Sequence, residues 1–173
     1  RRPFQGDRFV AAGAERPFMR DILDAVADGE LSPTAAEAEL RGYARTDAGR
    51  FDAARAARTG IPEGIIAAGK TPEETASMAV AAVETTECAL VTRVDATTVE
   101  ACRTRLDERF PDADVAYDDR ARTLVVHAPE YEPPSLSATA VVVTAGTSDA
   151  FPAGEAAVVL EEIGARVERI DDV

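Results

Sequence analysis

A chain of 173 residues can form one ordinary domain, or a small domain together with part of another. Hydrophobic residues make up 46% of it, and no apolar run approaches the roughly 20 residues of a membrane span, so a membrane-spanning protein is not expected. The net charge of -13 argues against an extended nucleic-acid-binding or anionic-membrane surface, because either would need a basic face.

The basic residues of this acidic chain are almost all arginine. Lys70 is the only lysine among 19 Lys and Arg residues, against 32 Asp and Glu residues. We associate this bias with proteins that work in concentrated salt, where screening removes most of the repulsion between acidic groups. The halophile-like interpretation predicts that the protein unfolds in low salt and recovers in molar salt, and indifference to salt would count against it.

The N-terminal part predicts a loose tail and then a helical hairpin. Residues 1–16 are broken by proline, glycine and aspartate, so they lack the continuous apolar segment of a secretion signal. Apolar residues then recur at every fourth position from Phe18 to Val26, and Gly29 offers a left-handed stop. The pair Ser32-Pro33 predicts the start of a second helix, which continues up to Gly42.

The middle of the chain predicts a small α/β module. Residues 43–58 have too weak a period to assign. The sequence Thr71-Pro72-Glu73-Glu74 is a capping box with proline at the first helical position, and its helix should run to about Val83. The other elements expected are a strand at 64–68, a buried strand at 88–92, a helix at 98–110, and a hairpin of 115–117 with 124–126.

The C-terminal part predicts the beginning of a parallel sheet. Residues 139–144 form an unbroken, largely β-branched run, which is typical of a parallel strand buried on both faces. A helix from Pro152 to Ile163, stopped by Gly164, and a strand at 166–170 complete a β-α-β unit. Such a unit cannot bury its own sheet, so we expect the natural polypeptide to continue or another chain to complete it. The expected domains are a tail (1–16), the helical hairpin with the α/β module (17–128), a proline-rich linker (129–138) and the incomplete parallel domain (139–173).

A phosphate-binding pattern, G-x-x-x-x-G-K-T, is formally present from Gly64 to Thr71. A loop that cradles phosphate needs a flexible turn between its glycines, whereas Ile65-Ile66 is strand-like, and the proline after Thr71 commits that side chain to capping its own helix. We therefore interpret the match as a decoy. Lys70 remains either an anion-binding group at a helix start or a solvated lysine.

A second candidate site is the loop from Thr144 to Asp149, which follows a presumed parallel strand at the place where open α/β sheets bind ligands. Gly146 lets the backbone approach a ligand, Thr147 and Ser148 supply hydroxyls, and Asp149 can accept hydrogen bonds from ribose. The equal alternative is a polar loop in which Ser148 or Asp149 only caps the helix.

The remaining reactive side chains suggest no chemistry. His127 is the only histidine and has no acidic pair spaced with it as a metal-ligand set, so a surface or strand-end histidine is expected and no metal site is predicted. Cys88 and Cys102 have neither the count nor the spacing of a disulfide framework or a zinc site, and we interpret both as free core cysteines in a reducing cytoplasm. No Ser-His-Asp or Cys-His nucleophile system is visible.

Five segments occur in an order that is informative as a set: RFDAARAARTGIPE at 50–63, GKTPE at 69–73, VTR at 91–93, VTAGTSD at 143–149 and VERIDDV at 167–173. In this order they resemble the LarB family, over residues 17–173. The last part is also similar to the start of the PurE family of aminoimidazole ribonucleotide carboxylases, in which a Gly-Ser-x-Ser-Asp loop holds phosphate and ribose. Ser148 and Asp149 match that loop, but Ala145 and Gly146 replace its first Gly-Ser, which fits LarB better.

The resemblance implies an α/β fold: an N-terminal helical hairpin and small α/β module, followed by the start of a PurE-like (flavodoxin-like) parallel three-layer domain. It implies carboxylation of the pyridine ring of nicotinic acid adenine dinucleotide by carbon dioxide or bicarbonate, and hydrolysis of the phosphoanhydride. The products would be AMP and pyridinium-3,5-biscarboxylic acid mononucleotide, for nickel-pincer cofactor synthesis. In that family a cysteine thiolate adds to the ring and makes it nucleophilic. That cysteine is expected after Val173, and its role is not given to Cys88 or Cys102.

Substrate contacts are expected from two groups of residues. Gly146, Thr147, Ser148 and Asp149 are assigned to the pyridine-ribose end of the dinucleotide, with Asp172 as a further contact; Arg58, Lys70 and Arg93 are assigned to the anionic end. No tightly bound cofactor is expected, with Mg²⁺ as the candidate ion, and the resemblance implies a homo-oligomer, with an octamer as one form. The alternatives are a purine-pathway carboxylase or mutase, which would lack the N-terminal 130 residues, and a non-catalytic nucleotide-binding module.

Overall fold

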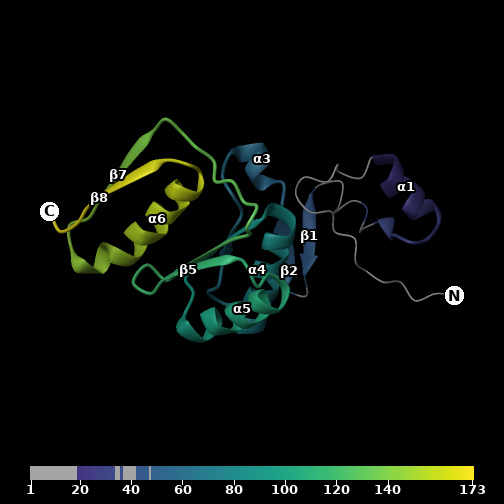
Figure 1. The fold of residues 1–173 in the computed structure, drawn as a ribbon, viewed down its shortest axis with the longest axis horizontal. Helices are drawn as coiled ribbons and strands as arrows, with labels where there is room; N and C mark the ends of the chain where they lie inside the picture. Colours follow the sequence, from purple (N-terminus) through teal and green to yellow (C-terminus); the bar gives the residue numbers. More distant parts are fainter. Residues whose placement is uncertain (1–18, 34–35, 37–41, 47) are drawn as a thin grey trace.

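The structure is a computed structural model, and it describes residues 19–33, 36, 42–46 and 48–173 (Figure 1). Its elements in chain order are α1 (Met19–Ala27), β1 (Tyr43–Thr46), β2 (Gly49–Asp52), α3 (Arg55–Thr59), β3 (Gly64–Ile66), α4 (Pro72–Thr86), β4 (Cys88–Thr92), α5 (Ala96–Arg109), β5 (Asp114–Asp118), β6 (Thr123–His127), β7 (Thr139–Val143), the 3-10 turn η1 (Thr147–Asp149), α6 (Ala150–Glu162) and β8 (Arg166–Ile170).

Helix α1 confirms the first helix of the predicted hairpin. Ile22 is buried, and Gly29 follows the helix with a φ of +75°, in the left-handed region that suits glycine. The predicted tail, Phe18 and most of the predicted second helix lie outside the described residues.

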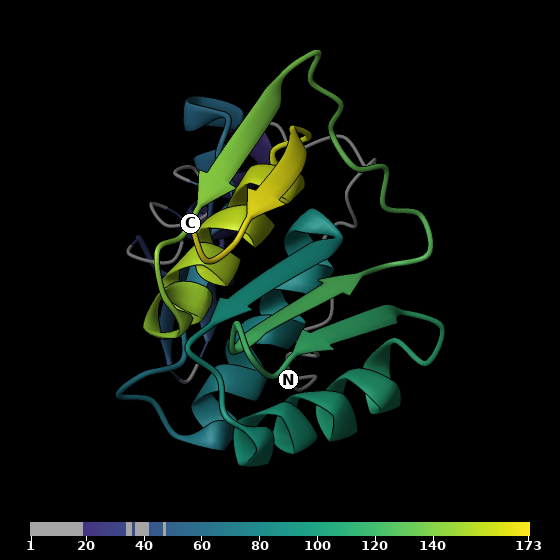
Figure 2. The same cartoon turned by 90° about the vertical axis from the view of Figure 1, so that its left-hand side faces the viewer.

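A four-stranded sheet with the order β3-β4-β6-β5 forms the centre of the molecule. Strands β3 and β4 run parallel, whereas β4, β6 and β5 are antiparallel neighbours. Every residue of β4 is buried, as its apolar sequence predicts for a strand covered on both faces. Figures 1 and 2 show the two sides of this sheet occupied by different helices, with α4 and α5 on one side and α6 on the other.

The main core lies between the sheet and helices α4 and α5. Alternate strand residues such as Ile65, Val91 and Leu124 are at most 1% exposed, because successive side chains of a strand point to opposite faces. They share one cluster with Val83 of α4 and Leu106 of α5. This side of the sheet is therefore fully used for stability, and a binding site has to be sought elsewhere.

The capping box at the start of α4 is confirmed. The Thr71 hydroxyl accepts from the Glu74 amide at 3.2 Å, and a Glu74 carboxylate oxygen accepts from the Thr71 amide at 2.8 Å. The helix extends beyond the predicted end at Val83, to Thr86. The extra turn is supported by the hydroxyls of Thr85 and Thr86, which donate to carbonyls of the preceding turn.

The described residues between 43 and 58, which the sequence pattern left unassigned, form two strands and the start of a helix. Strands β1 and β2 pair as an antiparallel hairpin, and α3 follows it. Ala44 and Phe51 are each 2% exposed and belong to the main core cluster. The sequence pattern does not indicate this hairpin, because its strands are four residues each and carry few apolar positions. Its place in the fold is set by packing against α4.

The predicted β-α-β unit is confirmed, with β7 and β8 parallel and Ala140 opposite Val167. The expectation that the first strand is buried on both faces is wrong: Val141 and Val143 are 52% and 56% exposed. Strands β7 and β8 form a two-stranded sheet, and α6 covers only one of its faces. The other face is open and mixed in character, with exposed Val141, Val143 and Ile170 beside the charged Arg166 and Glu168.

The fold class is therefore α/β, with parallel pairs in two sheets. Among the described residues, no helix is both long enough and apolar enough to cross a membrane.

Candidate functional site

The loop between β7 and α6 lies at the carboxyl end of a parallel strand, as predicted. The Asp149 amide donates to the Gly146 carbonyl at 3.0 Å and closes the turn η1. An Asp149 carboxylate oxygen accepts from the Ala145 amide at 3.3 Å, and Asp149 makes no side-chain cap on α6. The side chain of Asp149 thus turns back over the loop, while Thr147 and Ser148 are exposed beside it. This arrangement leaves the loop hydroxyls free to face a ligand.

Thr144 fixes the loop to the end of β8. Its hydroxyl donates to Asp171 at 3.2 Å and accepts from the Asp172 amide at 3.3 Å, and Thr144 itself is buried. Asp172 has a φ of +67°, a left-handed conformation that is uncommon outside glycine but tolerated by aspartate. The structure therefore places Asp172 at the same edge as Gly146 and Asp149, and substrate binding by these residues stays a prediction.

The three predicted cations are less closely grouped. Arg58 forms a two-pronged hydrogen-bonded ion pair with Asp52, and this pairing raises the pKa of its guanidinium. The Arg93 guanidinium lies 3.2 Å from Glu155 of α6. Lys70 Nζ donates to the Ile66 carbonyl at 2.8 Å, and within the described part of the chain it forms no ion pair. Arg93 thus reaches the helix that the loop begins, whereas the contacts of Arg58 and Lys70 tie them to the neighbourhoods of β2 and β3.

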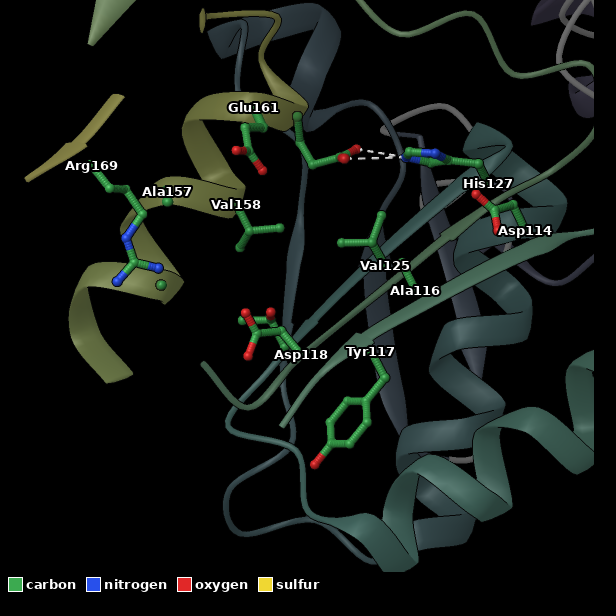
Figure 3. Close-up of a pocket in the computed structure, with 13 residues that line it drawn as sticks. Asp114, Ala116, Tyr117, Asp118, Val125, His127, Ala157, Val158, Glu161 and Arg169 are labelled. Atoms are coloured by element: carbon green, nitrogen blue, oxygen red, sulfur yellow. Dashed lines mark hydrogen bonds and ion pairs between the residues drawn. The ribbon is translucent and has the colours of Figure 1, made fainter. Parts of the chain in front are cut away.

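A cavity of about 360 Å³ lies between the four-stranded sheet and α6 (Figure 3). Its floor includes Ala116 and Val125 of the sheet, and its roof includes Val158 of α6. Figure 3 shows His127 and Asp118 toward opposite ends of the hollow. The charged residues that line it are mainly acidic: Asp114, Asp118, Glu161 and Glu162, against Arg169 and His127. Such a lining repels phosphate groups and favours a cation.

At the His127 end, two reactive side chains, Cys88 and His127, meet on the carboxylate of Glu162. The Cys88 thiol donates to Glu162 Oε2 at 3.3 Å, and His127 Nε2 lies 3.0 Å and 3.2 Å from the two Glu162 oxygens. Because a carboxylate only accepts, Nε2 carries the proton in this arrangement. Cys88 and Glu162 are 7% and 9% exposed, and the Tyr131 ring stacks on His127 with centroids 4.5 Å apart. We call Cys88, His127 and Glu162 the Cys-His-Glu cluster.

The two cysteines differ in their surroundings. Burial, and after it the negative charge of Glu162, raises the pKa of the Cys88 thiol strongly, so that without a bound cation it stays protonated at neutral pH. Burial alone raises the pKa of Cys102 to about 11. Burial is also the main cause of the raised pKa of Tyr131, followed by Cys88 and Glu162. Cys102 is therefore the inert core cysteine that the sequence predicted, whereas Cys88 belongs to a polar cluster.

The sequence pattern did not identify the partners of His127. His127 does end strand β6, as expected, but its neighbours there are Cys88, directly opposite in the strand register, and Glu162 from the last turn of α6. The separation along the chain hid this cluster: Glu162 lies 74 residues after Cys88. The pairing of β4 with the β5-β6 hairpin was the only signal that could have joined Cys88 to His127 in advance.

Comparison with known proteins gives two findings. The family model described as the LarB/PurE-like N-terminal domain matches residues 43–129, half of the chain. Uncharacterized protein MJ0165 of Methanocaldococcus jannaschii is 28% identical over 159 residues, which cover 90% of this chain and 61% of that protein. The chain thus spans about 61% of the length of this relative.

Proposed function

Because the chain belongs to the LarB/PurE-like N-terminal domain family, we propose that it works in an enzyme that carboxylates the pyridine ring of nicotinic acid adenine dinucleotide. The enzyme would then hydrolyse the phosphoanhydride and release AMP and pyridinium-3,5-biscarboxylic acid mononucleotide. The observation that carries the proposal is the combination of this family domain with a β-α-β unit whose first loop exposes Thr147 and Ser148 at a carboxyl strand end.

The geometry of the loop suits the ribose end of a nucleotide. Asp149 uses one carboxylate oxygen on the Ala145 amide, and its other oxygen can accept from a ribose hydroxyl. The loop leads directly into α6, whose amino-terminal end carries a partial positive charge that favours a nearby phosphate. Among the three predicted cations, Arg93 is the one that contacts α6, through Glu155. Arg169 pairs with Asp171 at the end of β8, next to Thr144.

The substrate can be tested with the natural gene product that carries this chain. We expect incubation with ¹³C-bicarbonate and nicotinic acid adenine dinucleotide to yield AMP and a labelled pyridinium mononucleotide, both detected by mass spectrometry. Aminoimidazole ribonucleotide is tested in parallel as the alternative substrate, because Ser148 and Asp149 also fit the PurE loop. Label in that compound alone would establish the purine-type carboxylase instead, and label in neither would favour a non-catalytic binding module.

The loop assignment gives a separate prediction for Asp149. Replacing Asp149 by Ala in the same protein should weaken dinucleotide binding by roughly 1–3 kcal/mol, the scale for removing a charged hydrogen-bond partner. Isothermal titration calorimetry measures the change. Asp107→Ala is the matched control, because Asp107 is exposed on α5 and should leave affinity unchanged. Equal affinities of the two variants would remove the loop from the substrate site.

A further inference from the structure

We propose that the Cys-His-Glu cluster is a Zn²⁺ site that joins the four-stranded sheet to helix α6. The three side chains each offer one ligand atom, and these atoms all lie within 4.8 Å of one another. The sulfur-to-oxygen and nitrogen-to-oxygen distances are 3.3 Å and 3.0 Å. Ligands bound to zinc at roughly 2.0–2.3 Å in a tetrahedron are themselves roughly 3.3–3.8 Å apart. The two distances to Glu162 therefore need only a small adjustment, and the separation between the Cys88 sulfur and the His127 nitrogen, at most 4.8 Å, has to fall in the same range.

The three ligands are held by separate and well-supported elements. Cys88 begins β4 and His127 ends β6, and the two residues are register partners across the antiparallel pair. Neighbouring side chains in such a pair lie on the same face, which here is the face toward α6. Glu162 ends α6 and reaches the pair from above. The donors are therefore positioned by the sheet and the helix before any ion binds.

The charge of the cluster also favours a cation. Glu162 is buried in the last turn of α6, where the helix dipole is negative, and that turn contains no basic residue. The adjoining cavity is lined by further acidic groups, among them Asp114 and Glu161. A hydrogen-bonded Cys-Glu-His network satisfies the polar atoms but supplies little positive charge, whereas a divalent ion would offset both the carboxylate and the helix end.

The donor types select the ion. A thiolate, an imidazole and a carboxylate are all zinc ligands, whereas Mg²⁺ and Ca²⁺ prefer oxygen alone. Binding releases the Cys88 thiol proton to solvent, and the neutral imidazole of His127 exchanges its Nε2 proton for one on Nδ1, so that Nε2 is free to bind the metal. His127 and Glu162 line the cavity, so a water from that side can complete the tetrahedron. The proposal does not depend on the substrate proposed above.

Cobalt substitution tests the site in the chelator-stripped, histidine-tag-free protein. Adding Co²⁺ should produce a sulfur-to-cobalt charge-transfer band and the intense visible bands of a tetrahedral centre, both saturating at one ion per chain. Zn²⁺ should then displace the cobalt. Absence of the charge-transfer band in the unmodified protein would overturn the proposal, because it would show that no thiolate binds the ion.

Matched variants identify the ligands. The Cys88→Ser variant should lose the charge-transfer band, whereas Cys102→Ser should keep it, because Cys102 is also buried but lies outside the cluster. His127→Gln and Glu162→Gln should each weaken Zn²⁺ affinity by at least about tenfold, since loss of an outer-shell partner alone costs that much. Far-ultraviolet circular dichroism shows whether each variant is folded. If Cys88→Ser unfolds, His127→Gln still tests the site, because His127 is partly exposed and its replacement disturbs the core less. Unchanged affinity in folded His127→Gln, or a band retained in Cys88→Ser, would refute the assignment.

Discussion

Replacing Leu106 by Ala is expected to lower the free energy of unfolding by about 2–5 kcal/mol. The Leu106 side chain is fully buried on α5, in the same core cluster as Val83 of α4 and Leu124 of β6. Truncation removes its apolar contacts and leaves a cavity that neighbouring side chains fill only in part. Urea denaturation at one fixed salt concentration, followed by circular dichroism, measures the change.

The control for this variant is Leu136→Ala, which makes the same chemical change on the surface. Leu136 is 50% exposed, so its truncation should alter the free energy of unfolding by less than about 0.5 kcal/mol. Similar losses in the two variants would contradict the assignment of the main core to the space between the sheet and helices α4 and α5.

The features that the sequence predicted well depend on local chemistry. The capping box at Thr71 requires only residues within one turn, and the buried strand Cys88–Thr92 is an uninterrupted apolar run. Gly29 and Gly164 both have the positive φ that a helix stop requires. In each case the signal and the structure it specifies occupy the same few residues.

The features that the sequence missed depend on distant contacts. The β1-β2 hairpin has two short strands, and its place in the fold is set by packing on α4. The Cys-His-Glu cluster needs the β4-β6 register and the position of α6 at once, and no spacing within the chain records either. The exposure of Val141 likewise depends on what lies beside the strand, which a residue pattern does not contain.

Helix α6 connects the two candidate sites. The proposed substrate loop at Gly146–Asp149 leads into its first turn, and Glu162 ends its last turn. Between them Gly154 packs against the hairpin turn so closely that a Cβ at this position would lie 2.3 Å from the Cβ of Ala121. A metal ion at Glu162 would therefore help to fix the helix that begins at the loop, which links zinc occupancy to the orientation of the substrate site.

The position of α6 also depends on Gly164, and its replacement by Ala tests that dependence. Gly164 has a φ of +91°, and a Cβ there would lie 2.3 Å from the Pro134 carbonyl oxygen of the segment before β7. The left-handed conformation should cost about 1–2 kcal/mol and the clash with a backbone atom about 1–3 kcal/mol more, giving a total loss of roughly 2–5 kcal/mol in the free energy of unfolding.

The Gly29→Ala variant is the control that separates the conformational cost from the cost of the clash. Gly29 has a φ of +75°, and nothing lies within 4 Å of the added Cβ, so this variant should lose only the conformational part. Both variants can be compared by urea denaturation under identical conditions. Equal losses would show that the segment at Pro134 gives way to the new methyl group, and that the close approach of this segment to Gly164 does not hold the carboxyl end of α6 in place.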